Sequence, residues 1–326
     1  MTPRFHPLRR SLVAAGLALA ALPFAHAQGQ YPERPIKLLV GYSAGGGVDA
    51  IARMLSSRLP ELLGQQVVVE NKAGAAGVIA ADTVAKAPAD GYTLLLGESG
   101  LLINKHLNPK MPFDPLTGFT PVAGVFQSPL MIVANNDLPV SNPKELVARA
   151  KANPGRLSYA TSGVGTVHHL GMETFKGRTG THIVHIPYRG ASQIVPDVIS
   201  GQVPLGVVSA TAGLSQAKAG KLRAVAMMSD DKLPGAENVP ALSQAVPGLS
   251  VAPRLFVLAP AGTPQPVIQR LNDAIRKVIT SPETAEAAAK QGAIPAYLPP
   301  AELTKEMKQE SQQWAEVIKQ QKVTLE

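Results

Sequence analysis

The chain has 326 residues and no cysteine, so neither a disulfide framework nor thiolate chemistry is available to it. Its formal net charge is +8, but the charges are scattered and aromatic residues make up only 4%, which argues against nucleic-acid binding. At roughly 150 residues per domain this length favours two domains, and a mildly basic surface favours small anions as ligands.

The N-terminal segment is typical of a secretory signal peptide. Three arginines precede an apolar stretch over 12–24, and small residues follow it where a signal peptidase would cut. The stretch is shorter than the ~20 residues that a membrane-spanning helix needs. We expect cleavage after Ala27 and a periplasmic mature chain. The pair Arg9-Arg10 leaves both Sec and twin-arginine export open.

Beyond this leader, β-branched and leucine-rich runs alternate with alanine-rich helical stretches, the pattern of an α/β protein with a largely parallel sheet. In the first part of the chain, the expected strands are 36–40, 66–70 and 92–96, and the expected helices are 48–59 and 75–87. A proline-rich connection over 108–121 separates these elements from a second set.

The second set repeats the alternation. Its expected strands are 130–134, 157–160, 182–188, 205–210 and 222–228, and its expected helices are 143–152, 167–176 and 193–201. A linker over 234–253 follows. A strand over 255–259, helices opened by Thr263-Pro264 and Ser281-Pro282, and a long amphipathic helix over 300–321 complete the chain.

Four of the expected strands end in small polar or glycine-rich turns that lead into helices. The turns are 41–47 (GYSAGGG), 97–100 (GESG), 161–166 (TSGVGT) and 209–211 (SAT). In open α/β sheets, ligands bind beyond the carboxyl ends of the strands, where helix N-termini present free N–H groups. Because two turns come from each half of the chain, we expect a cleft between two domains, lined with amides and hydroxyls.

The first turn also matches a hydrolase motif, because Gly41, Ser43 and Gly45 satisfy the G-x-S-x-G pattern of a nucleophile elbow. Against this interpretation, only one strand of the mature chain precedes Ser43, and no oxyanion segment lies upstream of it. Asp114 or Asp137 would have to complete a triad with one of the later histidines. A secreted serine esterase that uses Ser43 stays open as the alternative function.

Metal and nucleotide sites have weaker support. Residues 182 and 185 are histidines three apart on an expected strand, so they point to opposite faces and cannot share an ion. His169 and Glu173, four apart on an expected helix, can pair with each other. The turn 41–47 lacks the Gly-Lys-Ser/Thr end of a phosphate loop and does not match G-x-G-x-x-G. We therefore expect no metal and no cofactor.

Binding of a small anion requires none of these groups. Successive glycines allow several N–H groups to face one point, and the helix that follows adds about half a positive charge there. Hydrogen bonds to a charged acceptor contribute roughly 1.5 to 3 kcal/mol each, so four or five of them suffice for micromolar binding of a carboxylate.

Several longer motifs together resemble one known family. They are "YPERPIKLLVGYSAGGGVD", "LGQQVVVENKAGAAGVIAADTVAKAPADGYTLLLG", "SGVGTVHHLGMETFK", "HIPYRGA", "ISGQV", "AGKLRAVA" and "LAPAGTP". Along nearly the whole mature length, the chain resembles the Bug family, the periplasmic solute-binding receptors of tripartite tricarboxylate transporters. The resemblance implies an α/β, two-domain periplasmic-binding-protein (Venus flytrap) fold with two crossover strands.

The same resemblance implies a receptor, not an enzyme, that binds a small organic carboxylate. We expect a monomer, although the sequence leaves the oligomeric state open. The receptor would deliver the ligand to the membrane permease subunits of a tripartite tricarboxylate transporter or act as a sensor. Domain 1 would comprise 28–125 and 250–326, and domain 2 would comprise 126–249 with the return crossover.

The resemblance also implies which residues bind the ligand. They lie mainly in the turn after the first strand and in the glycine–serine turn of the second domain, over 162–166. The full set is Tyr42, Ser43, Ala44, Gly45, Gly46, Gly47, Glu98, Ser99, Ser162, Gly163, Gly165, Thr166, His169, Ser209 and Arg254.

Four of these positions depart from the family's usual pattern. Ser43 and Ala44 stand where relatives usually have prolines, and Ser43 adds a hydroxyl. Glu98 stands where a neutral threonine is usual, which argues against a pure polyanion; it suits an ammonium-bearing or hydrogen-bond-donating ligand, or pairs with a base. Arg254 stands near the place of an aromatic residue and is a candidate to complement Glu98 or a second carboxylate.

Overall fold

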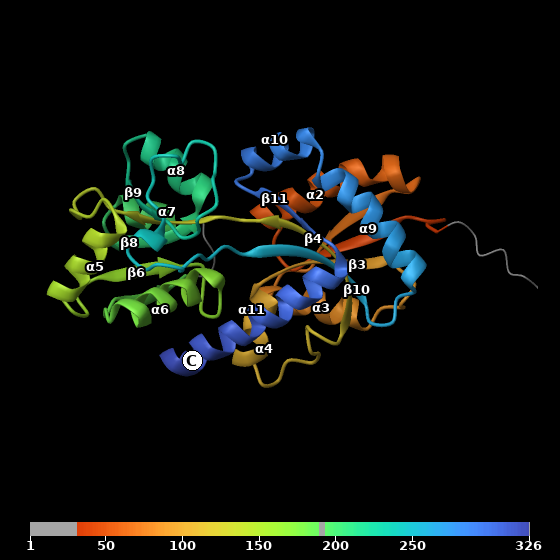
Figure 1. The fold of residues 1–326 in the computed structure, drawn as a ribbon, viewed down its shortest axis with the longest axis horizontal. Coiled ribbons are helices and arrows are strands. Elements are labelled where there is room, and N and C mark those ends of the chain that lie inside the picture. Colours follow the sequence, from red (N-terminus) through yellow and green to blue (C-terminus); the bar gives the residue numbers. More distant parts are fainter. Residues whose placement is uncertain (1–30, 189–192, 326) are drawn as a thin grey trace, which may run out of the picture.

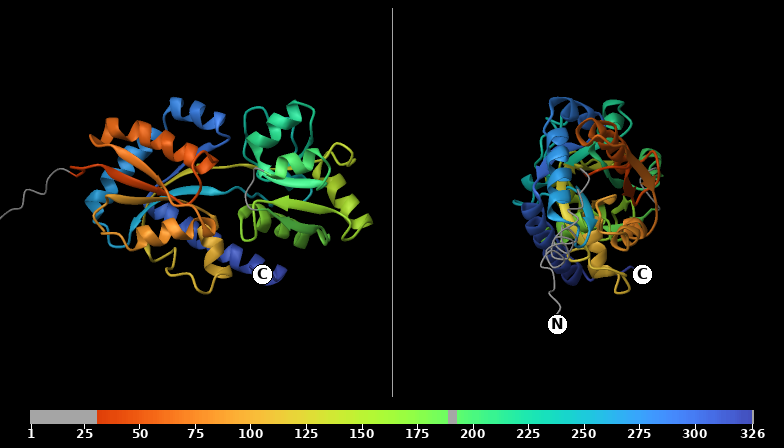
Figure 2. Two further views of the ribbon diagram at one scale, coloured as in Figure 1. Left: turned by 180° about the vertical axis from the view of Figure 1, so that it is seen from behind. Right: turned by 90° about the vertical axis from the view of Figure 1, so that its right-hand side faces the viewer.

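The computed structural model describes residues 31–188 and 193–325, so the expected signal peptide lies outside the described residues. The described chain forms two α/β lobes that lie side by side and are joined by extended strands (Figures 1 and 2). None of the described helices is long and apolar enough to cross a membrane.

The first lobe is built on a six-stranded sheet with the order β11-β4-β10-β3-β1-β2. Strand β1 pairs in parallel with β2 and β3, whereas β10 is antiparallel to both β3 and β4. The strands are β1 Ile36–Val40, β2 Val67–Asn71, β3 Thr93–Glu98, β4 Phe119–Gln127, β10 Arg254–Pro260 and β11 Ile294–Leu298.

Helices and one 3-10 turn cover both faces of this sheet (Figure 1). They are α2 Gly47–Leu63, η1 Ala75–Gly77, α3 Val78–Ala85, α4 Gly100–Leu107, α9 Gln265–Ile279, α10 Pro282–Lys290 and α11 Pro300–Gln321. The apolar face of α2, with buried Ile51, Leu55 and Leu59, packs with strand residues such as Leu38 and Leu96.

The second lobe is built on a five-stranded sheet with the order β7-β6-β8-β5-β9. Its strands are β5 Leu130–Ala134, β6 Ser158–Thr161, β7 Val184–Pro187, β8 Leu205–Ser209 and β9 Arg223–Met227. Its helices are α5 Pro143–Ala152, α6 Val167–Thr179, α7 Ile194–Ile199, α8 Ala210–Lys218 and the 3-10 turn η3 Leu242–Gln244.

Two neighbouring segments connect the lobes. Strand β4 of the first sheet leads through Ser128 and Pro129 into β5 of the second, and the segment before β10 returns to the first sheet. The two segments are hydrogen-bonded to each other, because the Ser128 N–H donates to the Pro253 carbonyl over 2.9 Å. The domain boundaries that we expected near 125 and 250 stay a prediction.

The long helix α11 also links the lobes, since it packs against α4 of the first lobe and α6 of the second. Its buried residues are Leu303, Met307, Ser311 and Trp314. The expected amphipathic C-terminal helix is therefore confirmed, and Trp314 belongs to its packing face.

Both sheets are mixed rather than largely parallel as expected, because β5, β10 and β11 run antiparallel to their neighbours. Two local expectations were also wrong and one strand was not predicted, and proline is involved in each of these three. Helix α2 continues through Pro60 to Leu63, because burial of Leu63 favours the helix over the break that proline promotes. Strand β4 begins within the expected proline-rich connection. Pro121 is tolerated there because the β4 ladder with β10 is irregular beside it, and Pro295 stands on the irregular edge strand β11.

Candidate functional site

The glycine-rich turn over 41–47 follows β1 and leads into α2, as expected. Residues 43–47 are exposed, and Gly45 adopts a left-handed conformation with φ of 81°. Gly46 and Gly47 have conformations open to any residue, so only one of the three glycines is required by backbone geometry. A Cβ atom at Gly47 would meet nothing within 4 Å. Glycine at this position therefore leaves open space in front of the helix.

The N-terminus of α2 presents unpaired N–H groups to that space. Its first backbone hydrogen bond runs from the Ala50 N–H to the Gly46 carbonyl over 2.9 Å, and the N-cap residue Gly46 has no side chain to cap it. Within the described residues, the N–H groups of Gly47, Val48 and Asp49 therefore have no acceptor. Free amides at the positive end of a helix form a site for an anion.

The buried side chain of Asp49 stabilises the turn over 41–47. Its carboxylate, only 2% exposed, accepts hydrogen bonds from the Gly45 N–H at 2.8 Å, from Asn71 Nδ2 at 2.9 Å and from Arg53 Nε at 2.9 Å. Burial alone would raise the pKa of Asp49, but these hydrogen bonds outweigh burial and lower the pKa. No role was expected for Asp49, but an acid two residues after a glycine run, at the start of a helix, is the signal that could have identified it.

The second glycine-rich turn, over 162–166, connects β6 to α6. The Thr166 hydroxyl caps α6 by accepting from the His169 N–H at 3.3 Å and donates to the Gly163 carbonyl at 2.8 Å. Both Gly163 and Gly165 have positive φ, of 136° and 74°. The Thr166 hydroxyl and the two glycines therefore fix the shape of this turn.

The second turn lies against the first lobe. A Cβ atom at Gly165 would lie 2.9 Å from Leu107 Cδ1 and 4.0 Å from Ile103 Cγ2, both on α4. The structure therefore places this turn in contact with α4 of the first lobe.

His169 supports the second turn from inside the lobe. It is 5% exposed, its Nδ1 accepts from the Gly165 N–H at 3.4 Å, and its Nε2 lies 3.6 Å from Glu173 Oε1. The expected pair of His169 with Glu173 is thus present. The His169 ring stacks on His185, with ring centroids 3.9 Å apart.

Glu173 is the centre of this support. Its Oε1 accepts from Tyr159 OH and from Lys176 Nζ, each over 2.6 Å. Burial pushes the pKa of Glu173 upward, but hydrogen bonds from His169, Lys176 and Tyr159 outweigh it and lower the pKa to about 2. Among the described residues, no group of three acids, histidines or cysteines is arranged to hold a metal ion.

Glu98 ends β3 beside the first turn. Its Oε1 accepts a hydrogen bond of 2.5 Å from Tyr42 OH. Ser99 is fully buried, and its Oγ accepts from the Arg254 N–H at 3.0 Å, so this side chain ties β3 to β10. Ser209 is exposed at the end of β8, where it caps α8.

Arg254 does not complement Glu98. Its guanidinium forms an ion pair with Glu306 of α11, and its Nη1 donates to the Ala296 carbonyl at 2.9 Å. This part of our expectation was wrong, because α11 supplies a carboxylate that no sequence motif placed beside β10. Arg254 lines a different cavity of about 520 Å³, between α11 and the segment 248–254.

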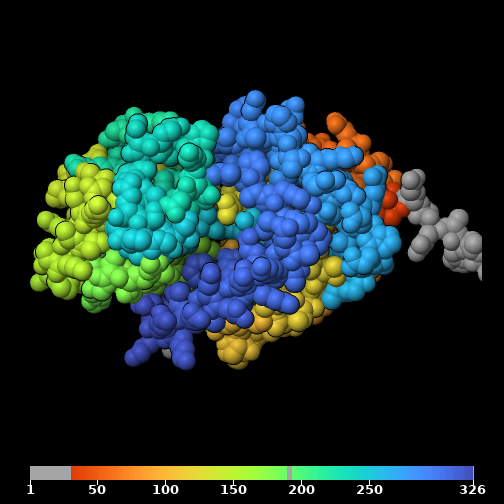
Figure 3. All heavy atoms as spheres, in the orientation of Figure 1, coloured from red at the N-terminus to blue at the C-terminus, as the bar shows by residue number. Residues whose placement is uncertain are grey.

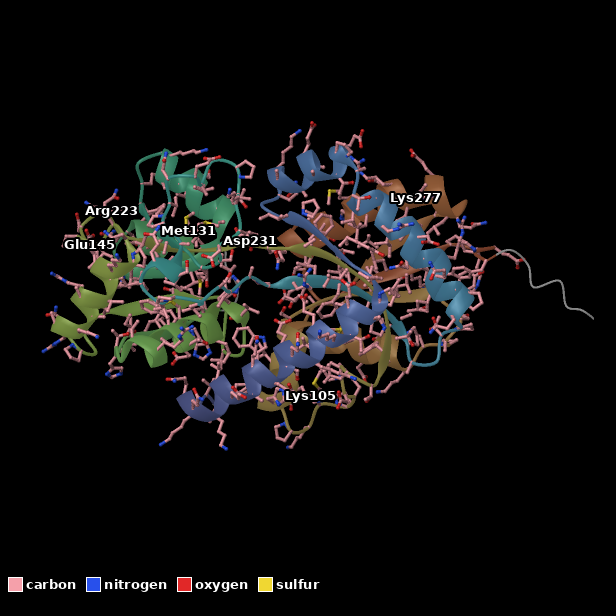
Figure 4. All side chains as sticks on the ribbon, in the orientation of Figure 1. Lys105, Met131, Glu145, Arg223, Asp231 and Lys277 are labelled. Atoms are coloured by element: carbon pink, nitrogen blue, oxygen red, sulfur yellow. The ribbon has the colours of Figure 1, made fainter. Side chains whose placement is uncertain are left out.

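Figure 3 shows an opening between the lobes beside α11, with the connecting strands at its floor. Asp231, which also lines the cavity, lies on the side of the second lobe that faces the first (Figure 4).

Comparison with known proteins agrees with this architecture. The family described as "Tripartite tricarboxylate transporter family receptor" matches residues 51–323. Protein BugT of Bordetella pertussis is 36% identical over 318 residues, which cover 96% of this chain and 98% of BugT.

Solved structures of the same kind also match. Periplasmic binding protein BugD is 33% identical with a TM-score of 0.78, covering 90% of this chain and 99% of BugD. Rpa4515 of R. palustris, solved with adipate, is 32% identical with a TM-score of 0.81 over 90% of this chain and 99% of its own. MatC of Rhodopseudomonas palustris, solved with malate, is 26% identical with a TM-score of 0.75 over 88% of this chain and all of its own.

The expected Bug-type resemblance and the two-domain periplasmic-binding-protein fold are thus confirmed. With a family match over most of its length and relatives above 30% identity, the chain belongs to the tripartite tricarboxylate transporter family of receptors.

Proposed function

We propose that this chain is a periplasmic receptor that binds a small organic carboxylate between its two glycine-rich turns and releases it unchanged. The observation that carries the proposal is the N-terminus of α2, where three neighbouring N–H groups lack an acceptor within the described residues and Gly47 leaves the space before them open. Two family neighbours, solved with adipate and with malate, support a carboxylate as the ligand.

In this proposal the two turns contribute different groups. The amides of residues 43–49 hold a carboxylate, with Tyr42 beside it and the Ser43 hydroxyl as an additional donor. The second turn, residues 162–166, borders the ligand on the other side; its Thr166 hydroxyl already bonds the Gly163 carbonyl and so supports the turn. Ser209 borders the site from β8. Ser99, His169 and Arg254 act as supports, since their polar atoms already bond within the chain.

The mature receptor, cleaved after Ala27, would act as a monomer in the periplasm. It would deliver its ligand to the two membrane permease subunits of a tripartite tricarboxylate transporter, or report the ligand to a sensor. Family membership supports the transport role, because the matching family is described as a transporter receptor.

Thermal unfolding of residues 28–326 with a panel of aliphatic, aromatic and amino-substituted carboxylates tests the proposal. A ligand at 100 times its Kd adds about 2.7 kcal/mol to the free energy of unfolding. For domains of this size the expected rise in Tm is roughly 5 to 11 °C. A panel in which no carboxylate raises Tm would contradict the proposal.

The esterase alternative gains no support. Within the described residues the Ser43 hydroxyl forms no hydrogen bond to a histidine or an acid, so no triad is assembled around it. Hydrolysis of an activated ester that disappears in Ser43→Ala would restore that alternative. In the receptor, Ser43→Ala should change affinity only modestly, because the backbone supplies most contacts.

A further inference from the structure

Glu98 places a carboxylate beside the proposed ligand site. Strands β1 and β3 are parallel neighbours, and Val40 is paired with Leu96, so Glu98 stands level with Tyr42 at the same edge of the sheet. Neighbouring strands lie about 4.8 Å apart. A carboxylate bound at the amides of α2 therefore has Glu98 within reach of the next atoms of the same small molecule.

Only one oxygen of this carboxylate is engaged. Oε1 accepts from Tyr42 OH, whereas Oε2 accepts no hydrogen bond from the described residues, and Glu98 as a whole is half-buried. An ionised carboxylate can accept at both oxygens. Oε2 is therefore an open acceptor at the edge of the site.

Glu98 also occupies the start of α4. A Cβ atom at Gly100 would lie only 3.1 Å from Glu98 Oε1. The backbone bonds of α4 begin at the Leu102 N–H, so the amides of Gly100 and Leu101 have no backbone acceptor in the described chain. The positive end of α4 thus faces an anion that belongs to the protein, whereas the positive end of α2 faces open space.

We infer that Glu98 selects the ligand: the site takes a small carboxylate that also carries an ammonium group, and it discriminates against a plain dicarboxylate. The inference rests on the proposed function. The first ligand carboxylate binds at α2, and an ammonium group binds Glu98 Oε2 by a charge-assisted hydrogen bond. A second ligand carboxylate in that place meets the like charge of Glu98 and finds α4 already neutralised.

Calorimetric titration with matched pairs tests the inference. The pairs are succinate and aspartate, glutarate and glutamate, and adipate and 2-aminoadipate, each differing only by the amino group. Because burial and the nearby Glu310 raise the pKa of Glu98, the titrations are made at pH 8, where the carboxyl ionises more fully. In the wild type, at least one aminated ligand should bind tenfold or more tightly than its plain partner.

The variants Glu98→Gln and Glu98→Thr should reduce this ratio to threefold or less. Glu98→Gln keeps the shape and an acceptor oxygen, and Glu98→Thr removes the carboxylate with less bulk, so agreement between them excludes a packing effect. Glu70→Gln on β2, where Glu70 pairs with Lys37 near the surface, is the matched control and should leave the ratio unchanged.

Two outcomes would overturn the inference. A wild type that binds a plain dicarboxylate as tightly as its aminated partner contradicts the role of Glu98 while leaving the receptor function intact. The same holds if both variants keep the tenfold ratio. If no ligand of the set binds and the wider carboxylate panel also fails, the receptor function falls together with the inference.

Discussion

The two glycine-rich turns of this receptor occupy equivalent places in their lobes but are held in opposite ways. The turn before α2 has an N-cap without a side chain, so the amides of residues 47–49 stay open, and buried Asp49 holds the turn from behind. The turn before α6 is capped by Thr166, so within the described residues one fewer amide of the first helical turn stays open. In the proposed site, the first turn therefore offers backbone N–H groups, whereas in the second turn the Thr166 hydroxyl already bonds within the chain.

The side chains that support the two turns should affect protein stability differently at low pH. Glu173, behind the second turn, has a pKa lowered from 4.5 to about 2 by hydrogen bonds that outweigh burial. Its stabilising contribution is complete above pH 4.5 and is lost as the pH falls through about 2; it amounts to about 3 kcal/mol. Urea unfolding between pH 5 and 2 should show this loss.

Glu173→Gln removes the titrating group, so that part of the acid sensitivity should disappear. Glu98 and Glu310 act in the opposite direction. Burial raises the pKa of both carboxyls, and their effect on stability is unfavourable as the pH rises through the raised values. An unchanged acid profile in Glu173→Gln would contradict the assigned low pKa.

The variant Gly47→Val tests whether the open amides at the start of α2 bind the ligand. The backbone at Gly47 suits any residue and a Cβ there meets no neighbour, so the free protein should unfold within about 1 kcal/mol of the wild type. The added side chain fills the space before the α2 amides, and carboxylate affinity should fall by about 100-fold, or about 2.7 kcal/mol.

Gly47→Ala should give an intermediate loss of affinity in the same calorimetric titration. Affinity that is unchanged in both variants would place the ligand elsewhere. At Gly46 the backbone, with φ of −81°, also suits any residue, and a valine there acts through its bulk near the Ser43 carbonyl.

The variant Asp49→Asn tests the buried carboxylate that stabilises the turn before α2. The change removes a buried charge that accepts three hydrogen bonds, and it places an amide nitrogen against donors. We expect a loss of about 2 kcal/mol in the free energy of unfolding, measured by urea denaturation. Asp273→Asn, on the exposed face of α9, is the control and should change stability by less than about 0.5 kcal/mol.

A substitution in the turn before α6 should lower the free energy of unfolding by less. Thr166→Val keeps the shape of the side chain but removes the hydroxyl that caps α6 and bonds the Gly163 carbonyl. Loss of an N-cap costs about 1 kcal/mol. A larger loss in Thr166→Val than in Asp49→Asn would reverse the comparison of the two turns.

Much of the fold follows from local pattern. The short apolar strands and the turns that end them were predicted in order, because period and turn chemistry are local properties. Strands β4 and β11 were not, because Pro121 and Pro295 read as breaks until the irregular ladders that accommodate them are seen. The two crossover strands came from the family resemblance and not from the pattern.

In the candidate site, too, some features were predictable from the sequence and others were not. The four turns were predictable because each follows a strand and precedes a helix. The roles of Ser99 and Arg254 were not, because they depend on β10 and α11, which lie far away in sequence. Asp49 was overlooked although its partner Gly45 is only four residues away.

The central claim is that backbone amides at the start of α2 hold the ligand carboxylate. Amide NMR spectra of the 15N-labelled mature protein, titrated with a carboxylate that raises Tm, test it most directly. We expect the largest downfield shifts at the N–H groups of Gly47, Val48 and Asp49, with smaller shifts in residues 162–166. Shifts confined to the cavity lined by Arg254 and Trp314, with residues 47–49 unmoved, would contradict it.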